Sequence, residues 1–248
     1  MADTSAALRD AIEAFKPSAG GPVPNDPWTM QHWEMAGAHV TFLNALLAIY
    51  EQAPAIPPQK QTNFAGFCLL WCAVLHSHHE FEEEAYFAMY EPKLDTRFVQ
   101  EEHGAFQEGI TAFESYLASC LPAGHPYGLD KTTPADQTPT PFDGAKLREL
   151  IDSFAPPLSV HLVNEVTHLE PEKLKAAGLT EAEMKHIAEV TQAYVKKYPV
   201  TRFLTFAMLC KPKWTAFPPV PGLLKHVLVP YVFAIPYRRF WEFVPKSN

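Results

Sequence analysis

Apolar residues recur at a helical spacing of three to four along most of the chain. This periodicity predicts amphipathic helices, because residues three or four apart share one helix face. A first run covers residues 28–52 and stops at Pro54, and three more helices are expected at residues 63–90, 96–120 and 143–170. No segment alternates with the two-residue period of a strand. The pattern therefore predicts an all-α protein built on an up-down four-helix bundle.

Prolines and glycines mark the places where helices are expected to stop. Pro156 and Pro157 lie inside the fourth helix and predict a kink or break, because proline lacks an N–H and clashes with the preceding turn. Residues 121–141 are rich in Pro, Gly, Asp and Thr and predict the longest loop. The tail at residues 199–248 is rich in Pro and aromatic residues without a clear period. We expect it to be an irregular cover, and favour a cap over the bundle end above a lining for a substrate entry.

These features divide the chain into three parts. Residues 1–27 form an N-terminal extension with a short leading helix at residues 5–15. Residues 28–171 form the four-helix bundle. Residues 172–248 form a C-terminal extension with additional helices and a capping tail. The first of these helices is opened by a capping-box sequence that begins at Thr180.

Histidines and carboxylates occur in all four expected helices, and two pairs have a spacing suited to a metal ion. His79 and Glu83 lie four residues apart, and so do His161 and Glu165. Residues at i and i+4 point to the same side of a helix, so each pair can aim at one point inside the bundle. A single pair of this kind is typical of a solvated face, so the prediction depends on the other two helices.

The other two expected helices, at residues 28–52 and 96–120, each contribute one histidine to the predicted site. His39 and His103 lie among apolar neighbours at registers that face the core. In an antiparallel bundle, residues of this kind at matching depth hold metal ions on the bundle axis. Imidazole and carboxylate together suit iron, manganese or zinc, and bridging carboxylates suit iron. The residues therefore predict a site for a pair of metal ions.

Other polar residues nearby are expected to play supporting roles. His76 and His78 are predicted to point away from the ligand face of their helix, towards the surface or a supporting position. His168 lies seven residues after His161, on the same face of the fourth helix, and is expected to support the ligand pair. One of Glu101 and Glu102 could orient a liganding histidine, as outer carboxylates do in metal sites.

Four stretches of the sequence, in this order, resemble the haemerythrin-like (HHE) family, in particular its fungal members. They are WEMAGAHVTFLNALLAIYEQA, LHSHHEFEEEAYFAMYEP, FVQEEHGAFQEGITAFESYL and LSVHLVNEVTHLEP, which lie within residues 28–171. The tail FPPVPGLLKHVLVPYVFAIPYRRFWEFVP is also similar to the C-terminal segment of those proteins. The resemblance implies two bound iron ions. It also implies the ligands His39, His79, Glu83, His103, His161 and Glu165.

The sequence departs from this family at one ligand position. Oxygen-carrying haemerythrins have a second histidine four residues after the one that matches His103, and here that position is Gln107. In iron-sensing relatives the residue after the histidine that matches His79 also binds metal, which brings in Glu80. The missing imidazole could be replaced by Glu80, by water, or by nothing.

This departure affects the expected function. Hard anionic donors stabilise higher oxidation states of iron, and an open position admits O2 or a substrate. Both favour O2 activation or iron sensing over reversible O2 carriage. We therefore expect a non-haem diiron oxidoreductase that uses O2 on a small organic substrate. The alternatives are a non-enzymatic O2- or iron-binding sensor or store, and an interaction module stabilised by metal.

The length, net charge, apolar runs and cysteine count of the chain argue against several other classes of protein. The chain has 248 residues and a net charge of −8, which argues against a general nucleic-acid binder. No apolar run reaches membrane-spanning length, and the first residues lack a signal-peptide pattern. The four cysteines are too few and too scattered for a disulfide framework. We expect a cytoplasmic protein with a small molecule or O2 as its partner, while the oligomeric state stays open.

Overall fold

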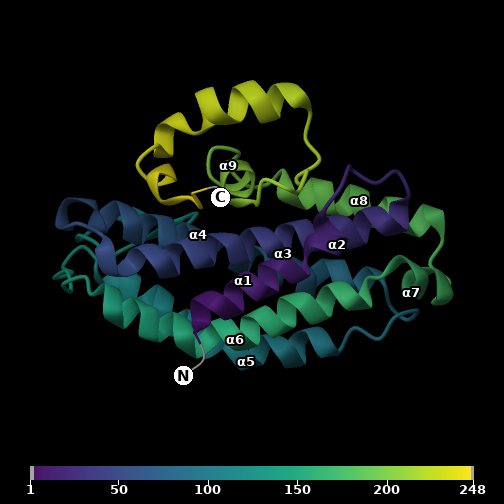
Figure 1. Cartoon of the computed structure of the whole chain (residues 1–248), viewed down its shortest axis with the longest axis horizontal. Helices are drawn as coiled ribbons and strands as arrows, with labels where there is room; N and C mark the ends of the chain where they lie inside the picture. The colour runs from purple at the N-terminus through teal and green to yellow at the C-terminus, as the bar shows by residue number, and fades with distance from the viewer. Residues whose placement is uncertain (1–2, 247–248) are drawn as a thin grey trace.

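The computed structural model describes residues 3–246, apart from the side chains of residues 98–101. Its four long helices lie side by side along the long axis of the molecule (Figure 1). They are α3 (Pro27–Gln52), α4 (Gln61–Phe81), α5 (Phe98–Ser119) and α6 (Gly144–His168). The short 3-10 turns Ala53–Ala55 and Pro58–Lys60 connect α3 to α4. The predicted all-α fold is confirmed.

The sequence fixes where two of these helices begin. Asp26 caps α3 by accepting a hydrogen bond from the Thr29 amide at 2.9 Å, with Pro27 at the first helical position. Asp143 caps α6 in the same way through the amides of Ala145 and Lys146. Each cap satisfies backbone donors that the first helical turn leaves without partners.

Of the kink or break expected at Pro156 and Pro157, the break is not found. Helix α6 runs through both residues without interruption. Pro156 is exposed, whereas Phe154 and Leu158 on either side of it are fully buried. The Pro156 ring therefore lies on the outer side of the helix, while Phe154 and Leu158 on the inner side pack in the core.

The helix expected at residues 63–90 changes its character near the end. Regular α4 stops at Phe81, a π-helical turn covers Glu82–Tyr86, and a 3-10 turn covers Phe87–Met89. A π turn inserts an extra residue per turn and shifts the side chains that follow it, and such turns recur at functional sites. Here the shift begins within the acidic part of the predicted metal motif.

The N-terminal residues pack on the bundle. Helix α1 (Thr4–Ala14) lies along α3 and α6, and the short α2 (Lys16–Ala19) lies against α3. Leu8, Ile12 and Phe15 from this segment are buried in the common core.

Two further helices, α7 (Pro171–Ala176) and α8 (Glu181–Val195), follow α6 in the chain. The capping box predicted at Thr180 is present, with reciprocal bonds between Thr180 and Glu183.

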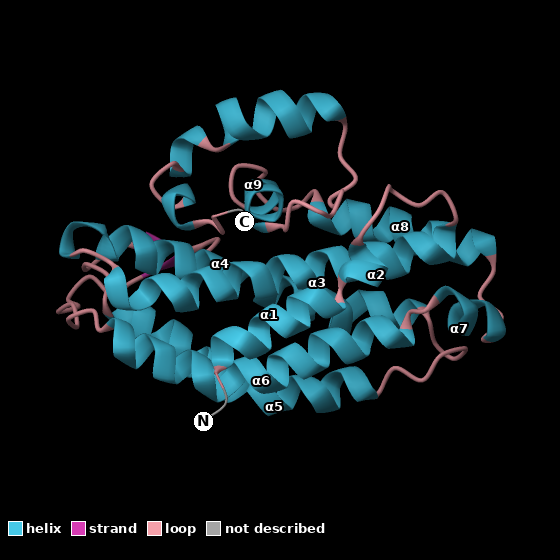
Figure 2. Cartoon of the chain, viewed as in Figure 1, coloured by secondary structure: helices cyan, strands magenta, loops and turns pink. Residues whose placement is uncertain are grey.

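The loop at residues 121–141 contains a small hairpin that the sequence pattern did not reveal. Strands β1 (Pro126–Tyr127) and β2 (Lys131–Thr132) pair antiparallel (Figure 2). Strands of two residues are too short to show an alternating pattern, so periodicity carries no signal for them.

The tail is more helical than expected and lies along the sides of α3 and α4 (Figure 1). It contains α9 (Phe203–Cys210), the π-helical η5 (Leu224–Phe233), and the 3-10 turns η6 (Ile235–Tyr237) and η7 (Trp241–Phe243). Phe206 and Phe243 are buried against the bundle. Among the described residues, no helix combines the length and the apolar character needed to cross a membrane.

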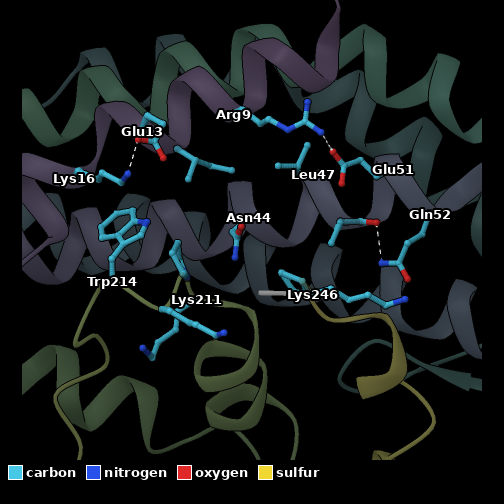
Figure 3. Close-up of a pocket in the computed structure, with 15 residues that line it drawn as sticks. Arg9, Glu13, Lys16, Asn44, Leu47, Glu51, Gln52, Lys211, Trp214 and Lys246 are labelled. Carbon is cyan, nitrogen blue, oxygen red and sulfur yellow. Dashed lines mark hydrogen bonds and ion pairs between the residues drawn. The ribbon is translucent and has the colours of Figure 1, made fainter. Parts of the chain in front are cut away.

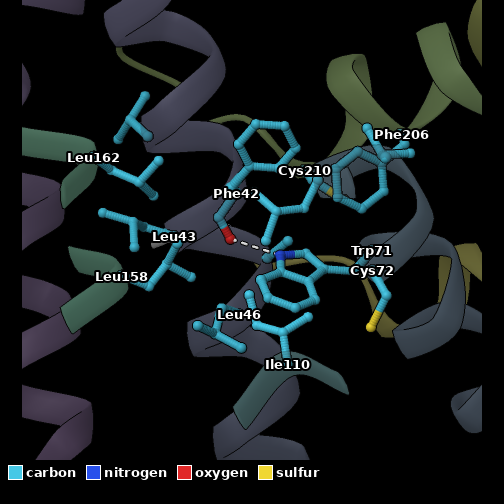
Figure 4. Packing of buried hydrophobic residues seen from close by; sticks show 14 of the residues in the cluster. Phe42, Leu43, Leu46, Trp71, Cys72, Ile110, Leu158, Leu162, Phe206 and Cys210 are labelled. Carbon is cyan, nitrogen blue, oxygen red and sulfur yellow. Dashed lines mark hydrogen bonds between the residues drawn. The ribbon is translucent and has the colours of Figure 1, made fainter. Parts of the chain in front are cut away.

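Aromatic packing fixes the relative positions of the long helices (Figure 4). The indole N–H of Trp71 in α4 donates to the Phe42 carbonyl of α3 at 3.1 Å. The same indole stacks on Phe154 of α6 and meets Phe113 of α5 edge-on. One residue therefore ties all four helices together, two turns before the histidines of α4.

Candidate metal centre

Five histidines and two glutamates from all four long helices and the π turn meet at one depth in the bundle. They are His39, His78, His79, Glu82, His103, His161 and Glu165. They form three overlapping groups in which one atom of each residue lies within 4.8 Å of the others, and such groups could hold metal ions. These residues are buried, apart from a slight exposure of His78.

The first half of the cluster is formed by His39, His78 and Glu82. The Nε2 atoms of His39 and His78 lie 3.0 Å apart. Oε1 of Glu82 lies 2.8 Å from Nε2 of His78 and 3.7 Å from Nε2 of His39. Three donor atoms therefore converge on one small volume.

The second half is formed by three imidazoles. Nε2 of His103 and Nε2 of His161 lie 3.1 Å apart. The ring of His79 lies with its centroid 4.3 Å from that of His103 and 5.6 Å from that of His161. This half therefore gathers three nitrogen donors.

Each glutamate contacts both halves. Glu82 turns Oε1 towards His39 and His78, while its Oε2 lies 4.0 Å from Nε2 of His103. Oε2 of Glu165 lies 3.2 Å from Nε2 of His161 and 3.7 Å from Nε2 of His39. Each carboxylate therefore lies within reach of donor atoms from both halves.

Hydrogen bonds to the outer ring nitrogens set the orientation of three imidazoles. Nδ1 of His39 donates to the Leu162 carbonyl at 2.8 Å. Nδ1 of His161 donates to Oε2 of Glu102 at 2.9 Å. A carbonyl and a carboxylate only accept hydrogen bonds, so Nδ1 carries the proton and Nε2 offers its lone pair to the centre.

The third of these bonds joins Nδ1 of His103 to Oε1 of Glu83 at 2.5 Å. Of the two acidic residues before His103, Glu102 orients a histidine of the cluster, because it accepts the hydrogen bond from Nδ1 of His161. The side chain of Glu101, the other candidate, lies outside the described residues.

Several buried polar atoms in the cluster have no hydrogen-bond partner among the described residues. They are Nε2 of His79 and both oxygens of Glu82 and Glu165. Nε2 of His78 lies close to Glu82, but its alignment is not that of a hydrogen bond. An unpaired buried acceptor or carboxylate costs several kcal/mol of folding free energy, roughly. Bound cations would satisfy all five atoms at once, so the donor set fits metal ions.

The protonation states agree with this reading. Burial alone would raise the pKa of Glu82, but His78, His39 and His79 together outweigh burial and hold that pKa well below its usual range. Burial lowers the pKa of His79 well below its usual range, so its ring is neutral and its nitrogen is free to bind a cation. For His161, burial would lower the pKa, but Glu165, Glu102 and Glu82 together outweigh burial and raise it. A metal ion would take the place of that proton.

The structure brings together five of the ligands predicted from the sequence, namely His39, His79, His103, His161 and Glu165. The other predicted residues lie outside the three groups. Glu80 is exposed near Tyr194, and Gln107 is exposed on α5. The Glu83 side chain is 39% exposed and reaches the cluster only through His103. His168 is half-buried in the last turn of α6.

The sequence reading missed His78 and Glu82, and the prediction that His78 points away from the cluster is wrong. A signal for both was present, because they are also four residues apart. Trp71 and Leu75 are fully buried, and continuing their spacing of four and three residues gives positions 78 and 82. The core register of α4 therefore leads to His78 and Glu82, with His79 on the edge of the same face.

A chain of buried polar side chains lies beside the cluster. The Tyr90 hydroxyl donates to the Tyr86 hydroxyl at 2.8 Å, and Tyr86 donates to Oε1 of Gln31 at 3.1 Å. Electrostatic repulsion from Glu165 contributes to the raised pKa of Tyr86, after burial and Tyr90. Burial also raises the pKa of Glu34, which acts on both tyrosines, to about 7.

Two hollows lie near this region without being lined by the clustered residues. A groove of about 810 Å³ separates α1 and α3 from the tail, with Asn44, Leu47, Lys211 and Trp214 among its walls (Figure 3). A smaller pocket of about 90 Å³ lies beside Phe15 and His32. The Phe15 ring meets His39 edge-on at 6.2 Å, so it stands between this pocket and the cluster.

Comparison with known proteins gives one distant relative. The chain is 26% identical over 224 residues to the "Dimeric xanthone biosynthesis cluster protein R11" of Cryptosporiopsis sp. (strain 8999). The match covers 86% of this chain and 77% of the relative. No family model matches the chain. No solved structure matches it either.

These findings establish an all-α protein with buried His/Glu clusters that could hold metal ions. They also establish a distant relative that its name assigns to a biosynthesis cluster. The haemerythrin-like resemblance, the iron ions and the cytoplasmic location stay predictions.

Proposed function

We propose that this chain is a non-haem diiron protein that uses O2 to oxidise a small organic molecule. The contact of Glu82 and Glu165 with both halves of the cluster carries this proposal. A single ion needs one ligand set, whereas carboxylates shared between two imidazole groups suit a pair of ions.

The ligands follow from the two halves. His39 and His78 would hold one ion, and His79, His103 and His161 would hold the other. Glu82 and Glu165 would bridge them. In this assignment His79 supplies the third imidazole of the second ion, so Gln107 leaves no gap to fill. Iron held in this way supplies Lewis acidity and one-electron redox chemistry for O2.

The chain's own residues would prepare the site for this chemistry. Glu83, Glu102 and the Leu162 carbonyl hold the imidazole protons on the outer nitrogens. The surrounding core keeps bulk water away from the carboxylates. The hydrogen-bonded hydroxyls of Tyr90 and Tyr86 lead to Gln31, and they form a buried polar chain beside the site.

The name of the relative supports a class of substrate. Its name places it in a cluster for dimeric xanthone biosynthesis, and xanthones are oxygenated aromatic compounds. We therefore propose a small aromatic secondary metabolite as the molecule that is oxidised.

A second candidate function is O2 or iron binding without turnover. Five imidazoles make the donor set richer in nitrogen than the ligands predicted from the sequence, and nitrogen-rich sites suit reversible carriage. The pocket beside Phe15 has a volume of about 90 Å³, which suits O2 or water better than an aromatic substrate.

Metal loading tests the centre itself. The purified protein is loaded with Fe(II) without air, and the bound iron is measured after desalting. Two ions per chain are expected. His79→Ala should leave one ion, because only the second half loses a ligand. The matched control is His76→Ala, which removes a histidine of the same helix that bonds Glu114 instead, and should keep two. One ion per chain in the unmodified protein would exclude the diiron proposal.

Admission of O2 separates the two functions. For an oxidase, O2 uptake should continue over many turnovers only when an aromatic phenol is present, because the phenol supplies the electrons that reduce O2. For a carrier, uptake should stop at one O2 per chain, and degassing should restore the original optical spectrum. A diiron protein with the second result would refute the proposed oxidation while leaving the metal centre intact.

A further inference from the structure

The tail presents a continuous apolar row to solvent. Leu223, Val227, Tyr231 and Ile235 repeat every four residues, and they are 64%, 45%, 71% and 59% exposed. With Val232, they make up five of the nine large apolar side chains that are exposed in the described part of the chain. This row lies on η5 and the turn after it, which arch away from the bundle over α9 (Figure 1).

The opposite side of η5 is also apolar. Val229 is fully buried, and the segment packs on α9. A helix that is apolar on both sides is normally covered on both sides. An exposed apolar row of this length therefore marks a surface that binds something.

The charge around the row identifies the kind of partner. Between Glu189 and Glu242 the chain has eight basic residues and no acidic one, although it has 28 acidic residues in all. Arg238 and Arg239 are exposed directly after the apolar row, and Lys225 lies within it. The acidic residues are therefore concentrated on the rest of the molecule, and this face is basic and apolar at once.

We propose that this face, residues 223–239, docks on the surface of an anionic lipid bilayer. The apolar row would enter the boundary between headgroups and acyl chains, with the segment parallel to the membrane plane. Tyr231 suits that boundary because its ring is apolar and its hydroxyl is polar. Arg238 and Arg239 would bind acidic headgroups, while the acidic bundle would face away from the bilayer.

The same charges disfavour a second copy of the chain as the partner. A two-fold symmetric dimer through this row would place the basic residues of one copy against those of the other. Such a contact is repulsive, whereas an anionic bilayer attracts every one of them.

The test is flotation of the full-length protein with lipid vesicles. Vesicles of phosphatidylcholine alone are compared with vesicles that contain about 30% phosphatidylserine, at low and high salt. The protein should float with the anionic vesicles, and bind roughly tenfold less to neutral ones or at high salt. Iron content does not enter this measurement, so its outcome is independent of the metal centre.

A matched pair of variants shows whether the row is responsible. Val227→Glu places a charge in the row, and Val160→Glu makes the same change at an exposed valine of α6. Val227→Glu should lose most of the bound fraction, while Val160→Glu should keep it. Tyr231→Glu is a second variant of the row, for use if Val227→Glu does not fold.

Four results would overturn the proposal. The first is no binding to anionic vesicles. The second is equal binding to neutral and anionic vesicles. The third is an equal loss of binding in the two valine variants. The fourth is self-association in size-exclusion chromatography that Val227→Glu abolishes, without vesicle binding, because the row would then join copies of the chain.

Discussion

Replacing Glu82 should have a much larger effect on metal binding than replacing its neighbour Glu83. Glu82 is fully buried and contacts both halves of the cluster, whereas Glu83 is partly exposed and only orients His103. The change to Gln keeps the size of each side chain and removes its charge. Glu82→Gln would therefore remove a bridging ligand, and Glu83→Gln an outer hydrogen bond.

The size of each effect can be estimated. A ligand present at about 100 times its dissociation constant stabilises the folded state by about 2.7 kcal/mol. For a chain of this length that corresponds to roughly 5–10 °C in Tm. Glu82→Gln should lose most of this rise, whereas Glu83→Gln should keep it at saturating iron. Loss of an outer partner lowers metal affinity by about 10–100-fold, so Glu83→Gln should only need more iron.

The assay is thermal unfolding of each variant with and without Fe(II) under anaerobic conditions, together with iron analysis. The readout is the difference in Tm between loaded and metal-free protein, so a general effect of the substitution on stability cancels. The reasoning is refuted if Glu82→Gln still binds two ions, or if Glu83→Gln loses more of the metal-dependent rise than Glu82→Gln.

Three further predictions concern groups around the cluster. Burial raises the pKa of Glu34 from 4.5 to about 7, so the stability it contributes is complete below pH 4.5 and is lost as pH rises through about 7. Glu34→Gln should therefore be more stable than the unmodified protein above pH 7 by up to about 3 kcal/mol, with no gain below pH 4.5, in urea unfolding. Trp71→Ala should lower stability by about 4 kcal/mol, since it leaves a cavity between helices, and a loss below about 1 kcal/mol would contradict the packing described here. Phe15→Leu should open the small pocket towards His39, and a chelator should then remove iron several times faster at unchanged stoichiometry; an unchanged rate would show that Phe15 does not close the site.

The bundle could be predicted from the sequence because its signals are local. Apolar periodicity gave the long helices, and Asp26, Asp143 and Thr180 marked helix starts through their own side chains. The spacing of His161 and Glu165 likewise needed only the geometry of one helix. These features depend on neighbours within a few residues.

The remaining features depend on contacts that sequence spacing does not contain. His79–Glu83 and His78–Glu82 have the same spacing, and the choice between these pairs depends on how α4 is rotated against α3 and on the π turn after Phe81. Pro156 was expected to break α6, but its exposure on the outer side could only be known once Phe154 and Leu158 had found partners. The tail likewise takes its helical form against the sides of α3 and α4.

Three of the seven clustered residues, His78, His79 and Glu82, come from little more than one turn at the end of α4. That turn supplies His78 to one half of the cluster and His79 to the other, with Glu82 between them. The first ion to arrive would order the turn and so prepare the ligands of the second, which makes loading cooperative. Unwinding of the same turn in the unmodified protein would withdraw ligands from both ions at once, and would therefore release the two ions together.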